Sequence, residues 1–522
     1  MSTEQAPTRP ESGSGADLGR ITPQLWWLSA IMAFGGFASL LDSTIINVAI
    51  GPLARTFDSP ISTVQWVVTG YLLALSAAIP LSSWAAARFG AKQMVICAQL
   101  LFLAGSVLAG LAWSAPSLIA FRLIQGIGGG LVVPVGQALL AQAAGPQRLG
   151  RLMGIVSIPS MFAPLVGPSL GGVLVDHLSW RWLFFINVPF CLITIVLVAL
   201  KVQNAVPPAK GAELDVLGLV LLIPGLTAFL YGLSEAGAKG GFGDTRTIVA
   251  LGAGVVVLAV FTVRALRVRL EPLVDLRLFK RSGFRYGTLA NFALSFAMYG
   301  VMIPLPMYFQ LVHGSSVTES ALLLLPQSIG FFIGVILMNP LTAMLGARGL
   351  SAAGVVLAVV GTIPFAFIDA DPNQVFLSVA MIVRGLGLGS SMLPTMTVAF
   401  SSVPRELAPK ATSGFNVFQR VASSLGTAVL AVVLQQHIED RLPAGGPPVA
   451  QIAPGSDLAK SLATAFGSPF WWALAFTALA IVPCLFLPGR TAVPAQGRAP
   501  GGGTAAGGKD TTRADESAVN TG

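Results

Sequence analysis

Residues 26–48 read WWLSAIMAFGGFASLLDSTIINV, a long apolar run whose one charged side chain is Asp42. A run of this length can cross a bilayer as a single helix. A carboxylate at the centre of a membrane helix costs roughly 2.5–3.5 kcal/mol on insertion scales. Asp42 is the only acidic residue deep inside any such run of this chain. Its cost implies a function, and the simplest is to bind and release a proton.

The composition is that of a polytopic membrane protein. The chain has 522 residues, of which 54% are hydrophobic and only 10% charged, with a mean hydropathy of +0.77. Soluble domains are nearer a quarter charged. Apolar runs long enough to span a membrane recur along the whole chain. We therefore predict an all-α membrane protein without a soluble catalytic domain, and we do not expect an enzyme.

Fourteen membrane spans are predicted from these runs. They cover approximately residues 26–48, 61–80, 93–113, 117–143, 148–174, 183–200, 216–233, 247–265, 286–311, 318–342, 349–368, 374–400, 410–437 and 467–488. An even number places both termini on the same side of the membrane. The predicted parts are a cytoplasmic disordered N-terminus (1–24), a six-helix bundle (25–200), two extra spans with a basic loop (201–285), a second six-helix bundle (286–488) and a disordered cytoplasmic tail (489–522).

The basic residues orient the chain. Of its 31 Lys and Arg residues, 22 fall on the side of the termini if these are cytoplasmic. The six on the outer side are Arg55, Arg181, Lys239, Arg246, Arg441 and Lys460. This bias follows the positive-inside rule, so the net charge of +9 indicates topology rather than nucleic-acid binding. The densest basic cluster, 264–285, either binds anionic lipid headgroups or simply orients the loop between the two halves.

No cofactor is expected. The three cysteines lie inside apolar spans and show no spacing typical of disulfides or metal sites. The tail carries Gly503 and Gly508-Lys509 in a pattern close to a phosphate-binding loop, but Asp510 replaces the Ser or Thr that the motif needs. ATP-driven transport within this chain is therefore not predicted, and a proton gradient is the expected energy source.

Three arginines lie within predicted spans. Arg122 lies in the outer half of the fourth span, at a depth that lets it approach Asp42 and tune its carboxylate. The alternatives are a structural Asp satisfied by neighbours and an Arg that snorkels to the interface. Arg384 opens a glycine-rich twelfth span much as Arg122 opens the fourth, a weak sign of duplication. Arg420 belongs to a polar patch that is structural or gating.

Two further groups of residues are singled out. The fifth span is rich in glycine and proline, which predicts either a hinge beside a cavity or ordinary close packing. The predicted hinge residues are Pro164, Gly167, Pro168, Gly171 and Gly172. Aromatic and amide side chains at membrane depth could line a cavity for flat apolar or cationic molecules, or could pack in the core. The predicted cavity residues are Gln65, Trp66, Tyr71, Gln125, Phe292, Phe296, Tyr299 and Asn416.

Several segments resemble, in order, the motifs of the 14-span drug:proton antiporters of the major facilitator superfamily (the EmrB/QacA type). They are Leu41-Asp42-Ser43-Thr44-Ile45-Ile46-Asn47-Val48-Ala49, Gln65 to Leu73, Arg122 with Gln125-Gly126, Gly167-Pro168-Ser169-Leu170-Gly171-Gly172, and Trp180 to Pro189. The resemblance implies two six-helix bundles, two extra helices between them, and a central cavity with alternating access. It also implies that Asp42 and Arg122 couple protons and that the fifth span is a hinge.

The chain departs from that family in the loop between the second and third spans. The family motif is roughly Gly-x-Leu-x-Asp-Arg-x-Gly-Arg-Lys, which forms a cytoplasmic gate. Arg88, Gly90 and Lys92 keep their places, but Ala87 replaces the acid. Gly51 also stands where the family usually has proline. Neither change affects the predicted proton site.

The sequence thus predicts a proton-coupled antiporter in the cytoplasmic membrane that exports small hydrophobic or cationic organic compounds. Its expected partners are a small-molecule substrate, protons and the lipid bilayer, without nucleic acid. The alternatives are a proton-coupled uptake symporter and a membrane sensor or lipid-handling scaffold that does not transport.

Overall fold

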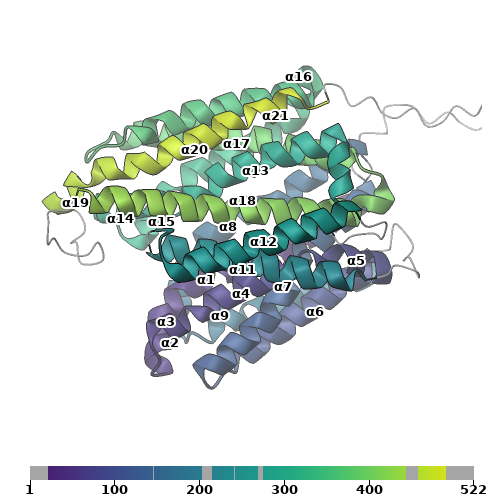
Figure 1. The fold of residues 1–522 in the computed structure, drawn as a ribbon, viewed down its shortest axis with the longest axis horizontal. Coiled ribbons are helices and arrows are strands. Elements are labelled where there is room, and N and C mark those ends of the chain that lie inside the picture. Colours follow the sequence, from purple (N-terminus) through teal and green to yellow (C-terminus); the bar gives the residue numbers. More distant parts are fainter. Residues whose placement is uncertain are drawn as a thin grey trace, which may run out of the picture. The chain divides into compact units, whose positions relative to one another are not determined.

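The computed structural model describes residues 22–144, 146–202, 214–239, 241–267, 274–441 and 456–488, and helix is the only regular structure over these ranges. Of the termini that we predict to be disordered, 1–21 and 489–522 lie outside the described residues, as does part of the basic loop between the eighth and ninth spans. Pro23 and Gln24, which we assigned to the disordered N-terminus, are instead the first residues of α1. Figure 1 shows the helices in the colours of the sequence.

The first six predicted spans fold into what we call the N-terminal helix group. Its elements are α1 (Pro23–Ile45), η1 (Ile46–Ala49), α2 (Ile50–Thr56), α3 (Ile61–Val64), α4 (Trp66–Ala78), α5 (Leu81–Phe89), α6 (Ala91–Gly110), α7 (Ala115–Ala144), α8 (Pro146–His177), α9 (Trp182–Phe185) and α10 (Asn187–Lys201). α4 and α5 together form one span that is bent by 53° where Pro80 interrupts it.

The remaining helices follow a linking pair. The pair is α11 (Val216–Lys239) and α12 (Thr245–Arg267). The C-terminal helix group comprises η2 (Leu276–Lys280), α13 (Ser282–Gly300), α14 (Pro304–Leu311), α15 (Val317–Leu323), α16 (Leu325–Ala366), α17 (Gln374–Ser401), η3 (Arg405–Leu407), α18 (Ala408–Glu439), α19 (Asp457–Ser461), η5 (Ala463–Gly467), α20 (Ser468–Leu479) and α21 (Ile481–Leu485).

The number of spans is compatible with fourteen. Eleven helices of the described residues are long and apolar enough to cross a membrane, and the bent pair α4–α5 makes a twelfth. α16 is in fact two helices, because Gly346 between them has φ 70° and ψ 165°, which only glycine adopts readily. The break falls between the predicted tenth and eleventh spans. Every predicted span overlaps at least one helix of the described residues, including the fifth, which falls on α8.

Glycines bring the helices of both groups into close contact at matching positions. A Cβ atom added at any of them would collide with a backbone atom of a neighbouring helix. The matching positions are Gly126 with Gly385, Gly128 with Gly387, and Gly130 with Gly389. In this register Arg384 is equivalent to Gln125, and not to Arg122. The repeat that the sequence suggested is present, but the two arginines occupy different places in it.

The two groups share one apolar core at one end. That core combines Leu139 and Leu149 of the N-terminal group with Phe284, Phe400 and Phe415 of the C-terminal group. It lies near the α5–α6 loop, which is the end predicted to be cytoplasmic. Hydrogen bonds from α18 also reach across this end to α4 and α7.

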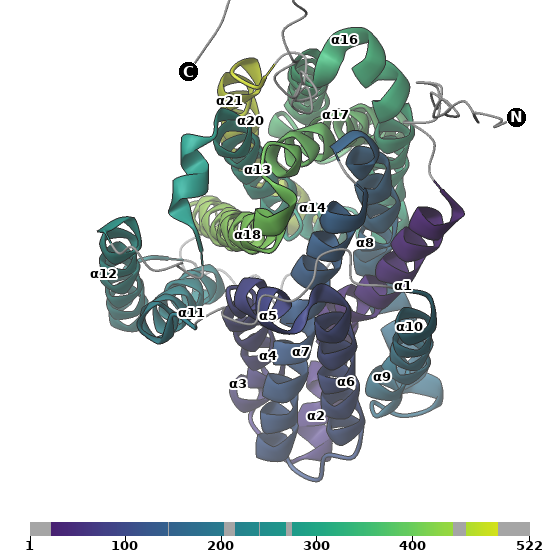
Figure 2. The ribbon, with the colours of Figure 1, turned by 90° about the vertical axis from the view of Figure 1, so that its right-hand side faces the viewer.

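The linking pair packs beside both groups. α11 contacts α4 of one group and α18 of the other, and α12 contacts mainly α11 (Figure 2). Valine and isoleucine side chains of α12 are largely exposed, as expected for a helix that faces lipid. At the base of the pair, Asp215 accepts hydrogen bonds from both terminal nitrogens of Arg264, at 2.9 and 2.7 Å. This ion pair fixes the two helices to each other.

Candidate functional site

Asp42 lies in the last turn of α1, buried to 1% exposure in the interior of the N-terminal group. Arg122 of α7, which is fully buried, places its Nη1 atom 2.5 Å from the Oδ2 atom of Asp42. A buried charge is tolerated in a protein interior when a partner of opposite sign is in contact with it. The two costliest side chains of the N-terminal spans therefore neutralise each other.

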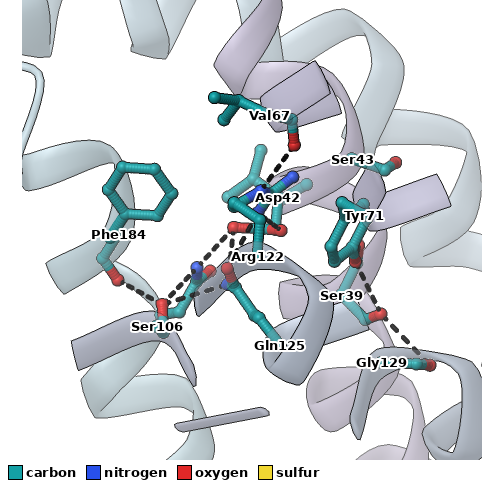
Figure 3. Close-up of polar contacts among 12 residues, drawn as sticks. Ser39, Asp42, Ser43, Val67, Tyr71, Ser106, Arg122, Gln125, Gly129 and Phe184 are labelled. Carbon is teal, nitrogen blue, oxygen red and sulfur yellow. Dashed lines mark hydrogen bonds and ion pairs between the residues drawn. The ribbon is translucent and has the colours of Figure 1, made fainter. Parts of the chain in front are cut away.

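Two amides complete the shell of the carboxylate. The Nδ2 atom of Asn187 and the Nε2 atom of Gln125 each donate to Oδ1 of Asp42 at 2.9 Å. Both amides also donate to the hydroxyl of Ser106, which in turn donates to the carbonyl oxygen of Phe184 at 2.8 Å. Figure 3 shows these groups converging on Asp42. Four helices, α1, α6, α7 and α10, thus contribute to one polar cluster, which we call the Asp42 cluster.

Arg122 is fixed from several sides. Its Nε atom donates to the Val67 carbonyl at 3.1 Å, and its Nη1 atom also donates to Oε1 of Gln125 at 2.8 Å. The guanidinium carbon lies 3.9 Å from the centroid of the Tyr71 ring, a cation–π contact. Tyr71 is itself held by donating to the Ser39 carbonyl at 3.1 Å. The orientation of the guanidinium is therefore set by α4 as well as by Asp42.

Helical spacing explains part of this arrangement. Arg122 and Gln125 are three residues apart on α7, so they lie on one face and reach the same carboxylate. The sequence predicted that Arg122 could approach Asp42. It did not predict Ser106 and Asn187, which complete the cluster from α6 and α10. Asn187 lies within the quoted stretch from Trp180 to Pro189, so a search for amides inside apolar spans would have found it.

The geometry determines how a proton could enter the cluster. In the structure three N–H donors point at the two oxygens of Asp42. These three donors leave one of the four lone pairs of the carboxylate open to a proton. A neutral carboxyl no longer attracts the charge of the guanidinium. Protonation of Asp42 therefore weakens its ion pair with Arg122.

The predicted hinge residues lie on α8. A Cβ atom at Gly167 would collide with Thr44, and one at Gly171 would lie 2.7 Å from Cγ2 of Val48, so both glycines let α8 approach α1 and η1. A Cβ at Gly172 would meet nothing within 4 Å. The side chains of Pro164 and Pro168 lie outside the described residues. A hinge role for this helix stays a prediction.

The predicted gate residues form the connection between α5 and α6. Gly90 has a φ of 88°, which favours glycine and allows the tight connection. The side chain of Arg88 is exposed, and the Nζ atom of Lys92 donates to the carbonyl of Ala199 on α10 at 2.9 Å. The loop is thus tied to the end of α10.

The eight predicted cavity residues fall in several places. Gln125 belongs to the Asp42 cluster, and Tyr71 of α4 packs on the Arg122 guanidinium of that cluster. Gln65 is exposed, and Trp66 is 43% exposed and stacks on Tyr231 of α11 at 5.9 Å between ring centroids. Trp66 borders an apolar recess of about 280 Å³ between α4, α7 and α11.

The other four belong to the C-terminal group. Phe296 is buried and stacks on Phe476 at 3.7 Å between ring centroids, while Phe292 and Tyr299 are partly buried on the same helix, α13. Asn416 of α18 donates to Oε1 of Gln137 on α7 at 2.7 Å, so it lies where the two helix groups meet. That the eight line one cavity stays a prediction.

The two remaining arginines differ from Arg122. Arg384 donates to Oε1 of Gln327 and to the carbonyl of Ala297, and no carboxylate of the described residues pairs with it. The Nε atom of Arg420 donates to the hydroxyl of Ser76 at 3.1 Å, which links α18 to α4. Arg420 therefore contributes to the contact between the groups, and a gating role for it stays a prediction.

A long helical chain with an ion pair buried among its spans is typical of a membrane transporter. The family model of the Major Facilitator Superfamily matches residues 32–427. The chain therefore belongs to the Major Facilitator Superfamily, and it is a multi-pass membrane transporter rather than an enzyme.

Known relatives and solved structures agree with this assignment. The multidrug resistance protein B homolog of Mycobacterium tuberculosis (strain ATCC 25618 / H37Rv) is 33% identical over 82% of this chain and 79% of its own length. The tetracenomycin C resistance and export protein of Streptomyces glaucescens is 32% identical over 80% and 77%. The lincomycin resistance protein LmrB of Bacillus subtilis (strain 168) is 30% identical over 77% and 84%.

Among solved structures, a double Trp mutant of XylE has a TM-score of 0.61 at 14% identity over 89% of this chain and 96% of its own. The human organic anion transporter MFSD10 has a TM-score of 0.58 at 14% identity over 90% and 100%. At these identities the likeness shows the fold alone.

Proposed function

We propose that this transporter is a proton-coupled antiporter that exports small hydrophobic or cationic organic compounds, including antibiotics, across the cytoplasmic membrane. The observation that carries the proposal is the Asp42 cluster. It holds one buried carboxylate at 2.5 Å from a buried arginine, and its residues come from four helices. An ion pair that weakens when its carboxylate binds a proton can link proton movement to substrate movement.

In the proposed cycle, Asp42 takes up a proton from the outer side and Arg122 loses its charged partner. Arg122 then has to find new acceptors, and the displacement of α7 favours the opposite-facing state. Release of the proton on the inner side restores the ion pair. Each proton that moves inward brings about 2.3 kcal/mol per 100 mV of membrane potential. This supply supports the export of a substrate against its gradient.

The class of substrate is supported by the relatives. Their names describe multidrug resistance, tetracenomycin C resistance and export, and lincomycin resistance. The exposed Trp66, stacked on the half-buried Tyr231 beside an apolar recess, suits flat, apolar compounds. The inside bias of Lys and Arg supports a cytoplasmic location for both termini.

The decisive experiment measures transport by purified protein in proteoliposomes with an imposed proton gradient. Asp42→Asn keeps the shape and removes the titratable group. We expect this variant to lose drug-dependent proton flux by at least about 100-fold, the scale associated with removal of a proton-transferring side chain. Substrate binding, measured by fluorescence of a flat cationic dye such as ethidium, should persist. Full proton flux in Asp42→Asn would refute the proposal.

A matched control is Asp215→Asn, which removes an acid of the α11–α12 pair and should leave proton flux unchanged.

The direction of transport separates the exporter from the symporter and from the non-transporting alternatives. In everted vesicles that are energised and then treated with a protonophore, an exporter accumulates substrate and loses it when the gradient collapses. A symporter expels substrate under the same conditions, and a sensor or scaffold does neither.

A further inference from the structure

Gln99 of α6 is a buried amide without a hydrogen bond. Its side chain is 1% exposed, and neither Nε2 nor Oε1 has a partner among the described residues. A buried polar group without a partner costs about 1–3 kcal/mol. Buried amides are almost always satisfied by protein or by ordered water. Gln99 therefore marks a place where the protein interior is built to bind something polar.

Two neighbours define the surroundings of this amide. A Cβ atom at Gly35 of α1 would lie 2.6 Å from Nε2 of Gln99, and 2.7 Å from Cγ2 and 3.2 Å from Oγ1 of Thr194 on α10. The amide of Gln99 and the side chain of Thr194 thus both pack against the bare backbone of Gly35, close to each other. Thr194 donates its hydroxyl proton to the Phe190 carbonyl at 2.8 Å, so its oxygen lone pairs are available as acceptors. The group can accept from and donate to a water molecule.

The position of this group relates it to the Asp42 cluster. Gln99, Thr194 and Gly35 are each seven residues from a member of that cluster on the same helix, namely Ser106, Asn187 and Asp42. Seven residues are about two helical turns, roughly 10.5 Å, and return to the same helix face. On all three helices the step runs towards the end predicted to be cytoplasmic. A second polar level therefore lies directly inward of the first.

An apolar layer separates the two levels. Ala38, Phe102 and Cys191 are fully buried and pack with Tyr71 in one hydrophobic cluster. In each helix the layer residue falls between the two polar levels: 38 between 35 and 42, 102 between 99 and 106, and 191 between 187 and 194. A layer of this kind excludes water, so it blocks proton movement while the helices stay packed.

The outer level also has unused hydrogen-bonding capacity. Nη2 of Arg122 and Oδ1 of Asn187 are buried and have no partner among the described residues. Asn187 lies on the same helix as Thr194. Polar atoms without partners thus occur on both sides of the apolar layer, which is the pattern expected of a path that is hydrated in only part of a cycle.

We propose that Gln99 and Thr194 hold water as the inner station of a proton path from Asp42, and that Phe102 and Cys191 form the gate between them. This inference rests on the proposed function. When the gate is hydrated, the O–H bond of the Asp42 carboxyl breaks and the proton passes to a water molecule. The carboxylate returns to its ion pair with Arg122. The hydronium passes a proton to the water held by Gln99, and then to the cytoplasmic side.

The first test removes the inner station. Gln99→Met keeps the volume, and Thr194→Val keeps the shape, while both remove hydrogen-bonding groups. We expect proton-driven transport to fall by at least about tenfold in Gln99→Met and less in Thr194→Val, with ethidium binding unchanged. Thr288→Val, in which an equally buried hydroxyl of α13 is lost, is the matched control and should transport normally. Unchanged transport in Gln99→Met would overturn the proposal.

The second test opens the gate and predicts an effect of the opposite sign. In a Cys97→Ser, Cys484→Ser background, Cys191 is the single thiol. We expect Phe102→Ala to leak protons without substrate and to let a water-soluble methanethiosulfonate modify Cys191, whereas Phe102→Leu stays tight. If Phe102→Ala did not leak protons and its Cys191 stayed unmodified, the proposal that Phe102 and Cys191 form a gate would be overturned. This result does not depend on whether Gln99→Met folds. If Asp42→Asn lost proton coupling while Gln99→Met transported normally, the proton path through Gln99 would be rejected, but the proposed proton-coupled antiport would stand.

Discussion

The two helix groups each bury an arginine in their glycine-rich helix, but the arginines have different surroundings. Arg122 contacts the carboxylate of Asp42, two side-chain amides lie within the same cluster, and an aromatic ring covers its guanidinium. Arg384 donates, within the part of the chain that the structure describes, to an amide oxygen and a backbone carbonyl. Among the described residues, the acid that pairs with a buried arginine belongs to the first group. The proton chemistry that we propose is therefore confined to the N-terminal helix group, although the two groups share a repeated architecture.

The glycine register sharpens this difference. Gly105 of α6 packs on the backbone of Gln125, and Gly361 packs on the backbone of Arg384, so these two residues are equivalent. The residue equivalent to Arg122 is then Met381. The C-terminal group thus carries its cation one helical turn away from the position that serves Asp42. The duplication preserved the close helix packing and not the ion pair.

The largest expected effect comes from Arg122→Met. This change leaves the Asp42 carboxylate buried without a cation, a loss that costs about 3–5 kcal/mol when one partner of a buried pair is removed. Asp42 can avoid this cost only by keeping its proton, so proton release stops. We expect drug-dependent proton flux to fall by at least about 100-fold in proteoliposomes. The double variant Asp42→Asn, Arg122→Met should be more stable to heat than Arg122→Met alone. If the single variant proved the more stable, the ion pair would not be what holds the cluster together.

The second effect is smaller and concerns Arg384→Met. Removing this cation leaves no carboxylate of the described residues unpaired. It takes a donor from the Gln327 amide oxygen and from the Ala297 carbonyl, at a cost of about 1–3 kcal/mol for each buried group left without a partner. We expect the loss of proton flux to be at least about tenfold smaller than in Arg122→Met. Equal losses in the two variants would mean that both halves take part in proton coupling.

The sequence predicted the ion pair because charges inside a membrane are costly and few. Asp42 and Arg122 could be matched by depth alone, since each needs a partner of opposite sign. Ser106 and Asn187 escaped prediction because neutral polar side chains cost less and occur in many spans. The layer around Phe102 could not be predicted either, because a buried phenylalanine is the most ordinary residue of a membrane helix.

The fold was predictable to the level of its spans for the same reason. Hydropathy marks where a helix crosses the membrane, and the predicted ranges on either side of Gly346 match the break in α16. The alignment of the two repeated halves was not predictable from the arginines. Their positions suggested that Arg122 and Arg384 are equivalent, and they are not. Only the contacts of Gly126 and Gly385 reveal the true register, because steric fit is a property of the assembled helices.

A third prediction compares equivalent glycines of the two groups. A methyl group at Gly426 of α18 would collide with the backbone carbonyl of Phe296, whereas at Gly167 of α8 it would first meet the hydroxyl of Thr44. A side chain can rotate away and a helix backbone cannot, so Gly426→Ala should be the more destabilising. Overpacking of this kind costs about 1–3 kcal/mol. Thermal unfolding of the two variants in detergent would check the order, and a larger loss in Gly167→Ala would contradict it.

The smallest effect concerns a second ion pair, between Asp215 and Arg264 at the base of the linking pair. Burial tends to raise the pKa of Asp215, but hydrogen bonds from Arg264 and from the Gly218 N–H outweigh it and lower the pKa. A lowered pKa stabilises the fold above the unfolded value of about 3.9, and this contribution is lost as the pH falls through the folded value. Asp215→Asn should therefore lower stability by about 1 kcal/mol at neutral pH.

The same variant separates a structural ion pair from a functional one. Its deficit in stability, measured by thermal unfolding, should shrink as the pH falls below about 4, because the wild-type carboxylate is then protonated as well. Proton flux should stay at the wild-type level throughout the range in which the protein is folded. If the stability deficit of Asp215→Asn persisted in acid, Asp215 would act through its hydrogen bond with the Gly218 N–H rather than through its charge. If the variant lost proton flux, the linking pair would belong to the proton-coupling residues. Asp42→Asn makes the contrast, because it should abolish flux at every pH.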